Sequence, residues 1–278
     1  MTSQLLKTLA GAYQRSGSQL VYLASDVKRG LDVAIPQPFS REQYLANHFA
    51  AISRIFPDAD FWVPAFNYDF SKSRVFNLSR DRSQVGHLSE YFRTRVAKFR
   101  TMVPIYSFAG TGSLLELHVG ESVLNPFGAN SIFARMVERD ALIFAYGCNW
   151  FHHTIIHYCE ELAGALLYRY FKTFSGHLQI SEQVSHSVAV RFHVRPLGFV
   201  IDYDWPRLRD DLTATHVLTS FVHGQQQFHF LSSKALVRYW CERLQDDPLY
   251  LLTPKTKKAV TDRLETIGGP FTLEEFES

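Results

Sequence analysis

The chain has 278 residues, of which 46% are hydrophobic and 20% are charged. This is the composition of a globular protein, and it excludes a disordered chain, a collagen-like repeat and a disulfide scaffold. The net charge of +2, from 29 basic and 27 acidic residues, is too balanced for a sequence-independent nucleic-acid binder, but it permits a local cationic pocket for a phosphate-rich ligand.

Helical and strand-like patterns alternate through the first half of the chain. Apolar spacing predicts helices over residues 2–15, 40–56, 86–99 and 131–138, and the best-patterned helix over 154–171. Strands are predicted over residues 20–24, 60–66 and 141–146, together with a strand that breaks into a glycine turn over 104–112. Residues 68–81 are expected to form an irregular loop.

Strands cluster in the second half. Alternating apolar residues predict strands over 187–194 and 197–203 and a short one at 228–230. Helices over 235–243 and 255–266 and a frayed acidic tail at 274–278 complete the chain. Without a repeat or linker to divide it, this order indicates a single α/β domain over residues 1–278, with a central mixed sheet flanked by helices.

Neither a membrane span nor a secretory leader is expected. The longest apolar run, around residues 141–151, is shorter than the roughly 18 residues that a membrane span needs. Residues 1–13 lack a cationic start followed by an apolar stretch. Cys148, Cys159 and Cys241 show no pairing pattern, which is typical of a reducing compartment. We therefore expect a soluble, cytoplasmic protein that binds neither a membrane nor nucleic acid.

The densest cluster of polar and aromatic residues is the run WFHHTIIHYCEE at 150–161. It follows a buried strand and a glycine, where sites form in α/β folds. On a helix His157 and Glu160 share a face, so the carboxylate can orient the imidazole and raise its basicity. Such an imidazole can take a proton from an amine. A solvent-facing histidine beside a carboxylate would show the same spacing.

A zinc site is the minor alternative for this cluster. His153 and His157 have the i,i+4 spacing of zinc-binding helices, and Glu160 or Glu161 could be a third ligand. However, the metalloprotease motif requires glutamate directly after the first histidine, where this chain has Thr154. A hydrolase using His153, His157 and Glu161 therefore stays open, but we expect no metal.

Residues 25–30 follow a strand and could bind an anion. Ser25 and Gly30 leave backbone N–H groups open to a ligand, and Lys28 and Arg29 could neutralise phosphates. The segment could equally be an exposed charged turn, since it matches no phosphate-binding fingerprint.

Two further segments could contact a substrate. Asp69 lies among aromatic residues after a strand and could hold an ammonium group or assist its deprotonation. The run from Ser107 to Gly112 offers hydroxyls and flexible backbone to a thioester carbonyl or a phosphate. Each could also be an ordinary strand end or turn. The chain has no GxSxG elbow, which disfavours serine hydrolase chemistry.

The order of these segments is more specific than any one of them. Ser25 and Gly30 are followed by VPAFNY at 63–68, VGHLSEYFR at 85–93, a 100–112 segment, an FGxxSxF motif at 127–133, Gly147, and the Thr154, His157 and Glu160 motif. Over about residues 20–175 the chain resembles the aminoglycoside 3-N-acetyltransferase family, whose relatives include biosynthetic amino-sugar N-acyltransferases. Departures from the family pattern are Leu23 in place of a histidine, and Thr101 and Val103 in place of a serine and a histidine.

The resemblance implies a CoA-dependent N-acyltransferase with an α/β fold distinct from the GNAT acetyltransferases. Acetyl-CoA or another acyl-CoA is the expected co-substrate, and a primary amine of an amino sugar is the expected acceptor. In direct transfer His157 would be the general base and Glu160 would orient it. The alternatives are an aminoglycoside acceptor, which would confer resistance, and a silent CoA-binding relative. The assembly could be a homodimer.

The remaining site residues complete the prediction. Those expected to line the acyl-CoA site are Ser25, Lys28, Arg29, Gly30, Ser107 and Gly112. Ser107 and backbone N–H groups would also stabilise the oxyanion. Asp69 is the third expected catalytic residue, and Tyr68, Glu90 and Glu161 are expected to contact the acceptor.

Overall fold

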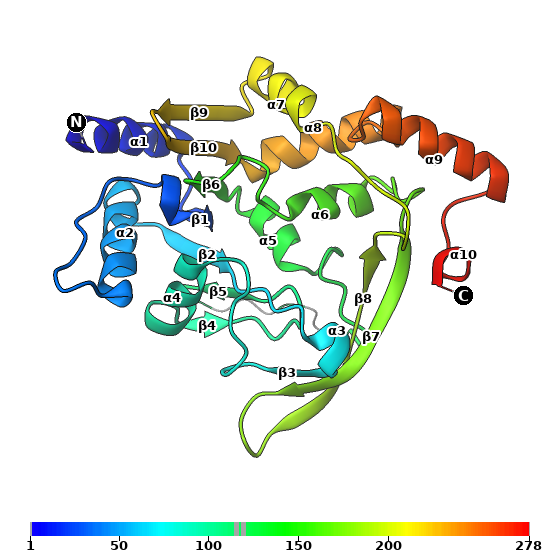
Figure 1. Cartoon of the computed structure of the whole chain (residues 1–278), viewed down its shortest axis with the longest axis horizontal. Helices are drawn as coiled ribbons and strands as arrows, with labels where there is room; N and C mark the ends of the chain where they lie inside the picture. The colour runs from blue at the N-terminus through cyan, green and yellow to red at the C-terminus, as the bar shows by residue number, and fades with distance from the viewer. Residues whose placement is uncertain (1, 114–116, 118–120, 278) are drawn as a thin grey trace.

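The computed structural model describes residues 2–113, 117 and 121–277 (Figure 1). Its central sheet has the strand order β4-β5-β2-β1-β6-β10-β9. In the middle, β1 (Leu20–Ser25) runs parallel to β2 (Asp60–Pro64) and to β6 (Leu142–Tyr146). Antiparallel strands extend both edges: β5 (Phe108–Gly110), β4 (Phe99–Arg100), β10 (Gln226–Ser232) and β9 (Leu218–His223). The predicted mixed sheet is confirmed.

Alternation along the strands divides the core between the two faces of the sheet. Leu20 and Tyr22 of β1 pack in one cluster, and Val21 and Leu23 pack in another, as the two-residue period of a strand requires. The first cluster contains residues of α5 (Ile132–Glu138), α6 (Ile155–Leu162) and α8 (Ser233–Asp246). The second contains residues of α1 (Thr2–Ser16), α2 (Arg41–Ile55) and α4 (His87–Arg95). Helices therefore cover both faces.

A second sheet lies beside the first. It has the order β3-β7-β8, with β3 (Val75–Asn77), β7 (Tyr170–Gln179) and β8 (Ser185–Val194). The β7–β8 hairpin is long and curved, and it runs down one side of the molecule (Figure 1). The other elements are η1 (Val27–Arg29), α3 (Phe70–Ser73), α7 (Trp205–Ala214), α9 (Pro254–Ile267) and α10 (Leu273–Glu277). No described helix is both long enough and apolar enough to cross a membrane.

The predicted helix over 154–171 is wrong beyond its second turn. α6 ends at Leu162, and Gly164 then takes a left-handed conformation with φ of 69°. Glycine in this position is a common helix terminator. The chain turns there and enters β7, so Tyr168 and Arg169 lie between the helix and the strand.

Three other expectations also fail. Residues 68–81 contain α3 and β3 and are not an irregular loop throughout. Residues 197–203 form no strand, and only Tyr203 makes an isolated bridge, to Leu252. The tail is ordered as α10, because Glu277 bonds Tyr170 and Lys172 and so ties the helix to β7.

Several histidines are buried in the neutral form. Burial lowers the pKa of His48 and His229 to about 4 and that of His153 to about 3. The unfolded chain binds protons at these imidazoles near the ordinary pKa of about 6.5. Below that pH the unfolded state therefore binds more protons than the folded state, and acidification favours unfolding.

We expect the free energy of unfolding to be fully developed above about pH 7 and to fall from about pH 6.5 towards pH 4. The loss should reach about 1.4 kcal/mol per histidine and pH unit. Urea denaturation across this range measures it, and His48→Gln should flatten the slope. A stability that rises on acidification would contradict the neutral burial of these rings.

The position of β1 determines where a site can form. Its parallel neighbours β2 and β6 lie on opposite sides of it, so the connections at its carboxyl end diverge. In open α/β sheets ligands bind in the crevice at such a switch point.

Candidate active site

A cavity of about 380 Å³ opens at the carboxyl ends of β1, β2 and β6. Ser25 at the end of β1 and Tyr68 beyond β2 line it, as do Cys148 after β6 and His157 of α6. The segment that follows β8 supplies another wall, with Arg195. The second half of the chain therefore completes a site that begins at the predicted switch point.

His157 and Glu160 meet as their spacing predicts. His157 Nδ1 lies 2.8 Å from Glu160 Oε2 across one turn of α6. The imidazole is 19% exposed, whereas the carboxylate is fully buried. Since Nδ1 is engaged by Glu160, Nε2 is the nitrogen left for a ligand, and it has no hydrogen-bond partner among the described residues.

Glu160 is held by a buried network that the sequence did not predict. Tyr168 and Tyr203 donate hydrogen bonds to Oε1, at 2.6 and 2.7 Å. Arg169 Nε lies 3.2 Å from Oε2, and its guanidinium also donates to the Tyr203 hydroxyl. His193 Nε2 is 3.6 Å from Oε2. The carboxylate is thus fixed in place and compensated in charge.

The electrostatics of this network set the protonation states. Burial raises the pKa of Glu160, but the charge of Arg169, the hydrogen bond with His157 and the nearby His193 outweigh it and hold the pKa well below the ordinary value. An ionised carboxylate can only accept a hydrogen bond. His157 therefore carries its hydrogen on Nδ1, which leaves a lone pair on Nε2.

The predicted rise in the basicity of His157 is wrong. Burial and the charge of Arg169 lower its pKa to about 4, although Glu160 acts in the opposite direction. The imidazole is thus neutral at physiological pH and can accept a proton without first losing one. Glu160 orients the ring and selects the tautomer.

Two other polar groups at the cavity are unsatisfied. His153 is 2% exposed, and both of its ring nitrogens lack a partner, as does the Ser25 hydroxyl. Nearby, the backbone N–H of Thr154 donates to the Tyr22 hydroxyl at 3.4 Å. A buried polar group without a hydrogen-bond partner costs free energy. His153 and Ser25 therefore have hydrogen-bonding groups available for water or a ligand.

Cys148 lines the cavity but is a poor nucleophile. Burial and the charge of Asp26 raise the pKa of its thiol to about 12, and the reactive form of cysteine is the thiolate. We therefore expect Cys148→Ala to retain kcat within about threefold, since a change of at least about tenfold would be needed to indicate a chemical role. An acetylated Cys148 peptide, detected by mass spectrometry after incubation with acetyl-CoA alone, would contradict this.

The structure brings Tyr68 to the cavity, but not the acidic residues that were expected to contact an amine. Asp69 is exposed at the start of α3 and does not line the cavity. Glu161 lies 2.5 Å from the Asn125 amide and 3.3 Å from His193.

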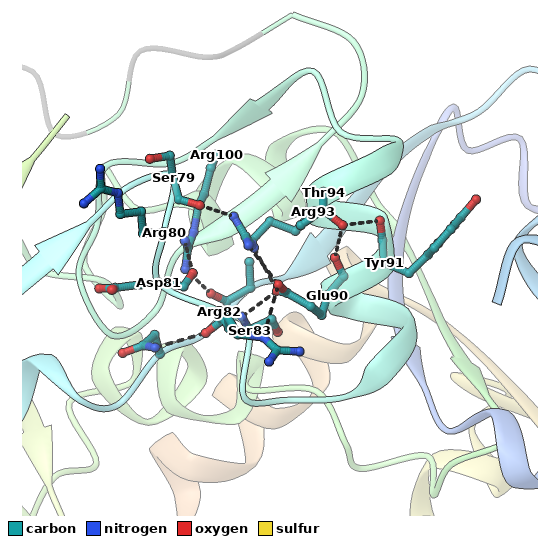
Figure 2. A network of polar contacts seen from close by, with 12 residues as sticks. Ser79, Arg80, Asp81, Arg82, Ser83, Glu90, Tyr91, Arg93, Thr94 and Arg100 are labelled. Carbon is teal, nitrogen blue, oxygen red and sulfur yellow. Dashed lines mark hydrogen bonds and ion pairs between the residues drawn. The ribbon is translucent and has the colours of Figure 1, made fainter. Parts of the chain in front are cut away.

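Glu90 is also turned away from the cavity. Figure 2 shows it within a network of polar contacts, where both of its carboxylate oxygens accept hydrogen bonds from Arg93. Ser83 N–H donates to it as well, and Arg82 lies 3.7 Å away. The charge of Glu90 therefore holds the 79–83 loop against α4.

Ser107 and Gly112 lie outside the cavity as well. The Ser107 hydroxyl donates to Ala65 O at 2.8 Å and accepts from Arg100 at 3.0 Å. Arg100 also donates to Ala65 O, which precedes Tyr68, and to Leu78 O and Asp81 O, which follow it, so it braces the segments on either side of Tyr68. Gly112 packs against Asp60, at the amino end of β2 and so at the opposite end of the strands from the cavity, because β5 runs antiparallel to β2.

Residues 25–30 form the predicted turn at the cavity edge. Lys28 and Arg29 are exposed on η1, directly after Ser25. Gly30 is required by packing, since a Cβ there would lie 2.3 Å from the Tyr146 ring.

The donor set fits a charge-compensated base better than a metal centre. His157, Glu160 and His193 place three potential ligand atoms within 4.8 Å of one another. However, Arg169 already balances the charge of Glu160, and both oxygens of Glu160 are hydrogen-bonded. Divalent zinc requires ligands whose charge and lone pairs are free. Glu161, the third ligand of the sequence alternative, bonds Asn125 and His193 instead.

The chain is similar to known proteins in sequence and in fold. A family model described as Aminoglycoside 3-N-acetyltransferase matches residues 55–245. The match includes His157 and Glu160 and extends past Arg195 and Tyr203. No curated protein sequence matches the chain significantly.

Solved structures share the fold at low sequence identity. The AAC-IIIb binary complex with CoASH has a TM-score of 0.65 at 16% identity and covers 87% of this chain and 96% of its own. Sisomicin-bound AAC-VIa has a TM-score of 0.62 at 16% identity, with 87% and 97% covered. The YokD protein from Bacillus subtilis has a TM-score of 0.63 at 12% identity, with 87% and 93% covered. The mixed α/β fold is therefore that of these acetyltransferases and not the GNAT fold.

Proposed function

Because the chain belongs to the aminoglycoside 3-N-acetyltransferase family, we propose that it transfers an acyl group from CoA, acetyl in the first instance, to a primary amine of an amino sugar. The observation that carries this proposal is the neutral His157 at the cavity, with Nδ1 bound to the ionised Glu160 and Nε2 unpaired. This is the arrangement that a general base for an amine requires.

The cavity suits both substrates together. The pantetheine arm would enter beside Ser25, whose hydroxyl is unpaired, and the exposed Lys28 and Arg29 are placed to meet CoA phosphates. AAC-IIIb, which shares the fold, has been solved with CoASH bound. Tyr68 would contact the acceptor from the other side. Arg195, Tyr203 and Trp205 join the wall from the second half of the chain, which supports residues 1–278 acting as one domain.

The reaction is a direct transfer. The amine nitrogen forms a bond to the thioester carbonyl carbon while His157 Nε2 takes a proton from the nitrogen. The C–S bond then breaks, and the imidazolium returns the proton to the departing thiolate, so an amide and free CoA are the products. Holding both substrates in one cavity supplies much of the rate acceleration.

A thiol-release assay tests the proposal. Acetyl-CoA and longer acyl-CoAs would be combined with a panel of amino sugars, with a colorimetric readout of free CoA. We expect release that depends on the amine and yields the N-acylated sugar by mass spectrometry. Hydrolysis of the thioester at a rate independent of the amine would contradict it.

An aminoglycoside acceptor is the second candidate. It is favoured by the related folds that have been solved with sisomicin or apramycin bound. Growth of cells expressing the chain on aminoglycoside plates separates the two candidates, since only this one predicts resistance.

A further inference from the structure

We propose that the amine acceptor carries an anionic group, a phosphate or a carboxylate, and that Arg195 binds this group at the cavity. The inference rests on the proposed N-acyltransferase function and specifies its acceptor.

Arg195 is free to bind a ligand. It follows β8 directly and lines the cavity with an exposed side chain. It makes no ion pair or hydrogen bond with any residue in the described part of the chain, unlike the buried Arg100 and Arg169. A guanidinium offers a rigid fork of donors that matches a phosphate or a carboxylate.

Arg195 lies on the side of the cavity where the acceptor is expected. Arg195 lines the same cavity as Tyr68 and His157. Its positive charge also opposes the rise in pKa that burial gives Tyr106. The Tyr106 ring lies 6.5 Å from that of Tyr68 and 4.8 Å from that of Phe127. Phe127 in turn contacts His157, at 5.4 Å. Arg195, Tyr68 and the base therefore share one neighbourhood.

The charges at the cavity favour an anion over a polycation. Among its described lining residues there is no aspartate or glutamate, and Arg195 carries the positive charge, because burial lowers the pKa of all three histidines and keeps them neutral. Outside the lining, Glu160 is engaged by Arg169, Glu161 by Asn125 and Glu90 by Arg93, whereas the exposed Asp26 acts on Cys148 and His152. An acceptor with several ammonium groups would meet a guanidinium where it needs a carboxylate.

An aromatic wall completes this subsite. Phe151 and Trp205 stack at 4.4 Å with an interplanar angle of 11°, and Tyr203 lies 5.0 Å from Trp205. All three line the cavity. Such a surface packs against the apolar face of a sugar ring or against a base. In an amino sugar that carries a phosphate, the phosphate would bind Arg195 and the sugar ring would pack against the aromatic wall.

The test is steady-state kinetics with acetyl-CoA and four acceptors: glucosamine, glucosamine 6-phosphate, UDP-glucosamine and kanamycin. We expect kcat/KM for at least one phosphorylated acceptor to exceed that for glucosamine by at least about tenfold. Arg195→Gln should raise KM for that acceptor by about 10- to 100-fold. In the same variant, KM for acetyl-CoA and KM for glucosamine should stay within about threefold of the parent values. A difference of that size is too small for the loss of a hydrogen bond to a charged group. In Arg195→Lys, KM for that acceptor should lie between the values for the parent and for Arg195→Gln, because lysine keeps the positive charge but lacks the paired N–H donors of the guanidinium.

The outcomes separate this inference from the function on which it rests. Turnover of kanamycin or glucosamine that equals or exceeds turnover of both phosphorylated amines overturns the anionic acceptor and leaves the N-acyltransferase function standing. A rise in KM for acetyl-CoA in Arg195→Gln, with no change for the acceptor, assigns Arg195 to the acyl donor and also overturns it. Failure of all four amines to release CoA overturns both proposals.

Discussion

Replacing His157 with alanine is expected to lower kcat by at least about 100-fold, the usual scale for loss of a general base. The ring is neutral because burial lowers its pKa to about 4, and its Nδ1 is fixed by Glu160. Alanine removes the only group of α6 that lines the cavity and can accept the amine proton. KM for acetyl-CoA should change little, since the lost interaction forms in the transition state.

The pH dependence gives an independent check of the same base. Because neutral His157 is the active form, its acid limb in kcat/KM for the acyl donor should lie near pH 4 and not near the ordinary 6.5 of histidine. His186→Ala, at the exposed end of the β7–β8 hairpin, is the matched control and should retain full activity. Near-normal kcat in His157→Ala would remove this residue from the mechanism.

Replacing Arg169 with methionine should lower stability more than any other single change considered. The guanidinium is 2% exposed and lies 3.2 Å from the fully buried Glu160 carboxylate. Burial lowers the pKa of Arg169, but the charge of Glu160 outweighs this and raises it overall, so both groups are charged in the folded state. Removing one partner leaves an uncompensated buried charge, at a cost of about 3–5 kcal/mol. The melting temperature should fall by roughly 6–15 °C.

The double variant separates charge from packing. Arg169→Met combined with Glu160→Gln removes both charges and should recover much of the stability lost by Arg169→Met alone. It should stay inactive, because a glutamine at 160 no longer provides an anion to hold the proton on Nδ1 of His157. A melting temperature for Arg169→Met within about 2 °C of the parent would show that the pair contributes little, since that shift corresponds to at most about 1 kcal/mol.

The central part of the fold was predictable because its signals are local. β1 and β6 are short continuous apolar runs, the pattern expected of strands buried in a sheet between two helical layers. Ser40 and Ser131 cap α2 and α5 at the N-terminal position that serine favours. Short edge strands such as β4, with two residues, carry too little pattern to be found.

The histidine–carboxylate pair was predicted because its two residues are close in sequence. His157 and Glu160 share a helical turn, so their spacing was sufficient. Glu160 is also contacted by His193 of β8 and by Tyr203, which lies in the segment after β8. These residues are far from α6 in the sequence, so no local pattern predicts their contact with Glu160. The one available signal was Gly164, whose left-handed conformation ends α6 and frees Arg169 to turn inward.

The electrostatic prediction for the base failed for a related reason. From the spacing alone, a carboxylate beside an imidazole raises its basicity. The lowered pKa follows from burial and from Arg169, twelve residues further along the chain. Tertiary structure therefore determines the protonation state of His157, while sequence spacing determines its partner.

A crystal structure of the chain with CoA bound tests the role of this cavity most directly. We expect the pantetheine arm to enter the cavity beside Ser25 and its sulfur to lie within a few ångströms of His157 Nε2, with Nδ1 still bonded to Glu160. Density for CoA elsewhere on the surface, with its sulfur remote from His157, would contradict the assignment of this cavity as the place where the acyl group is transferred.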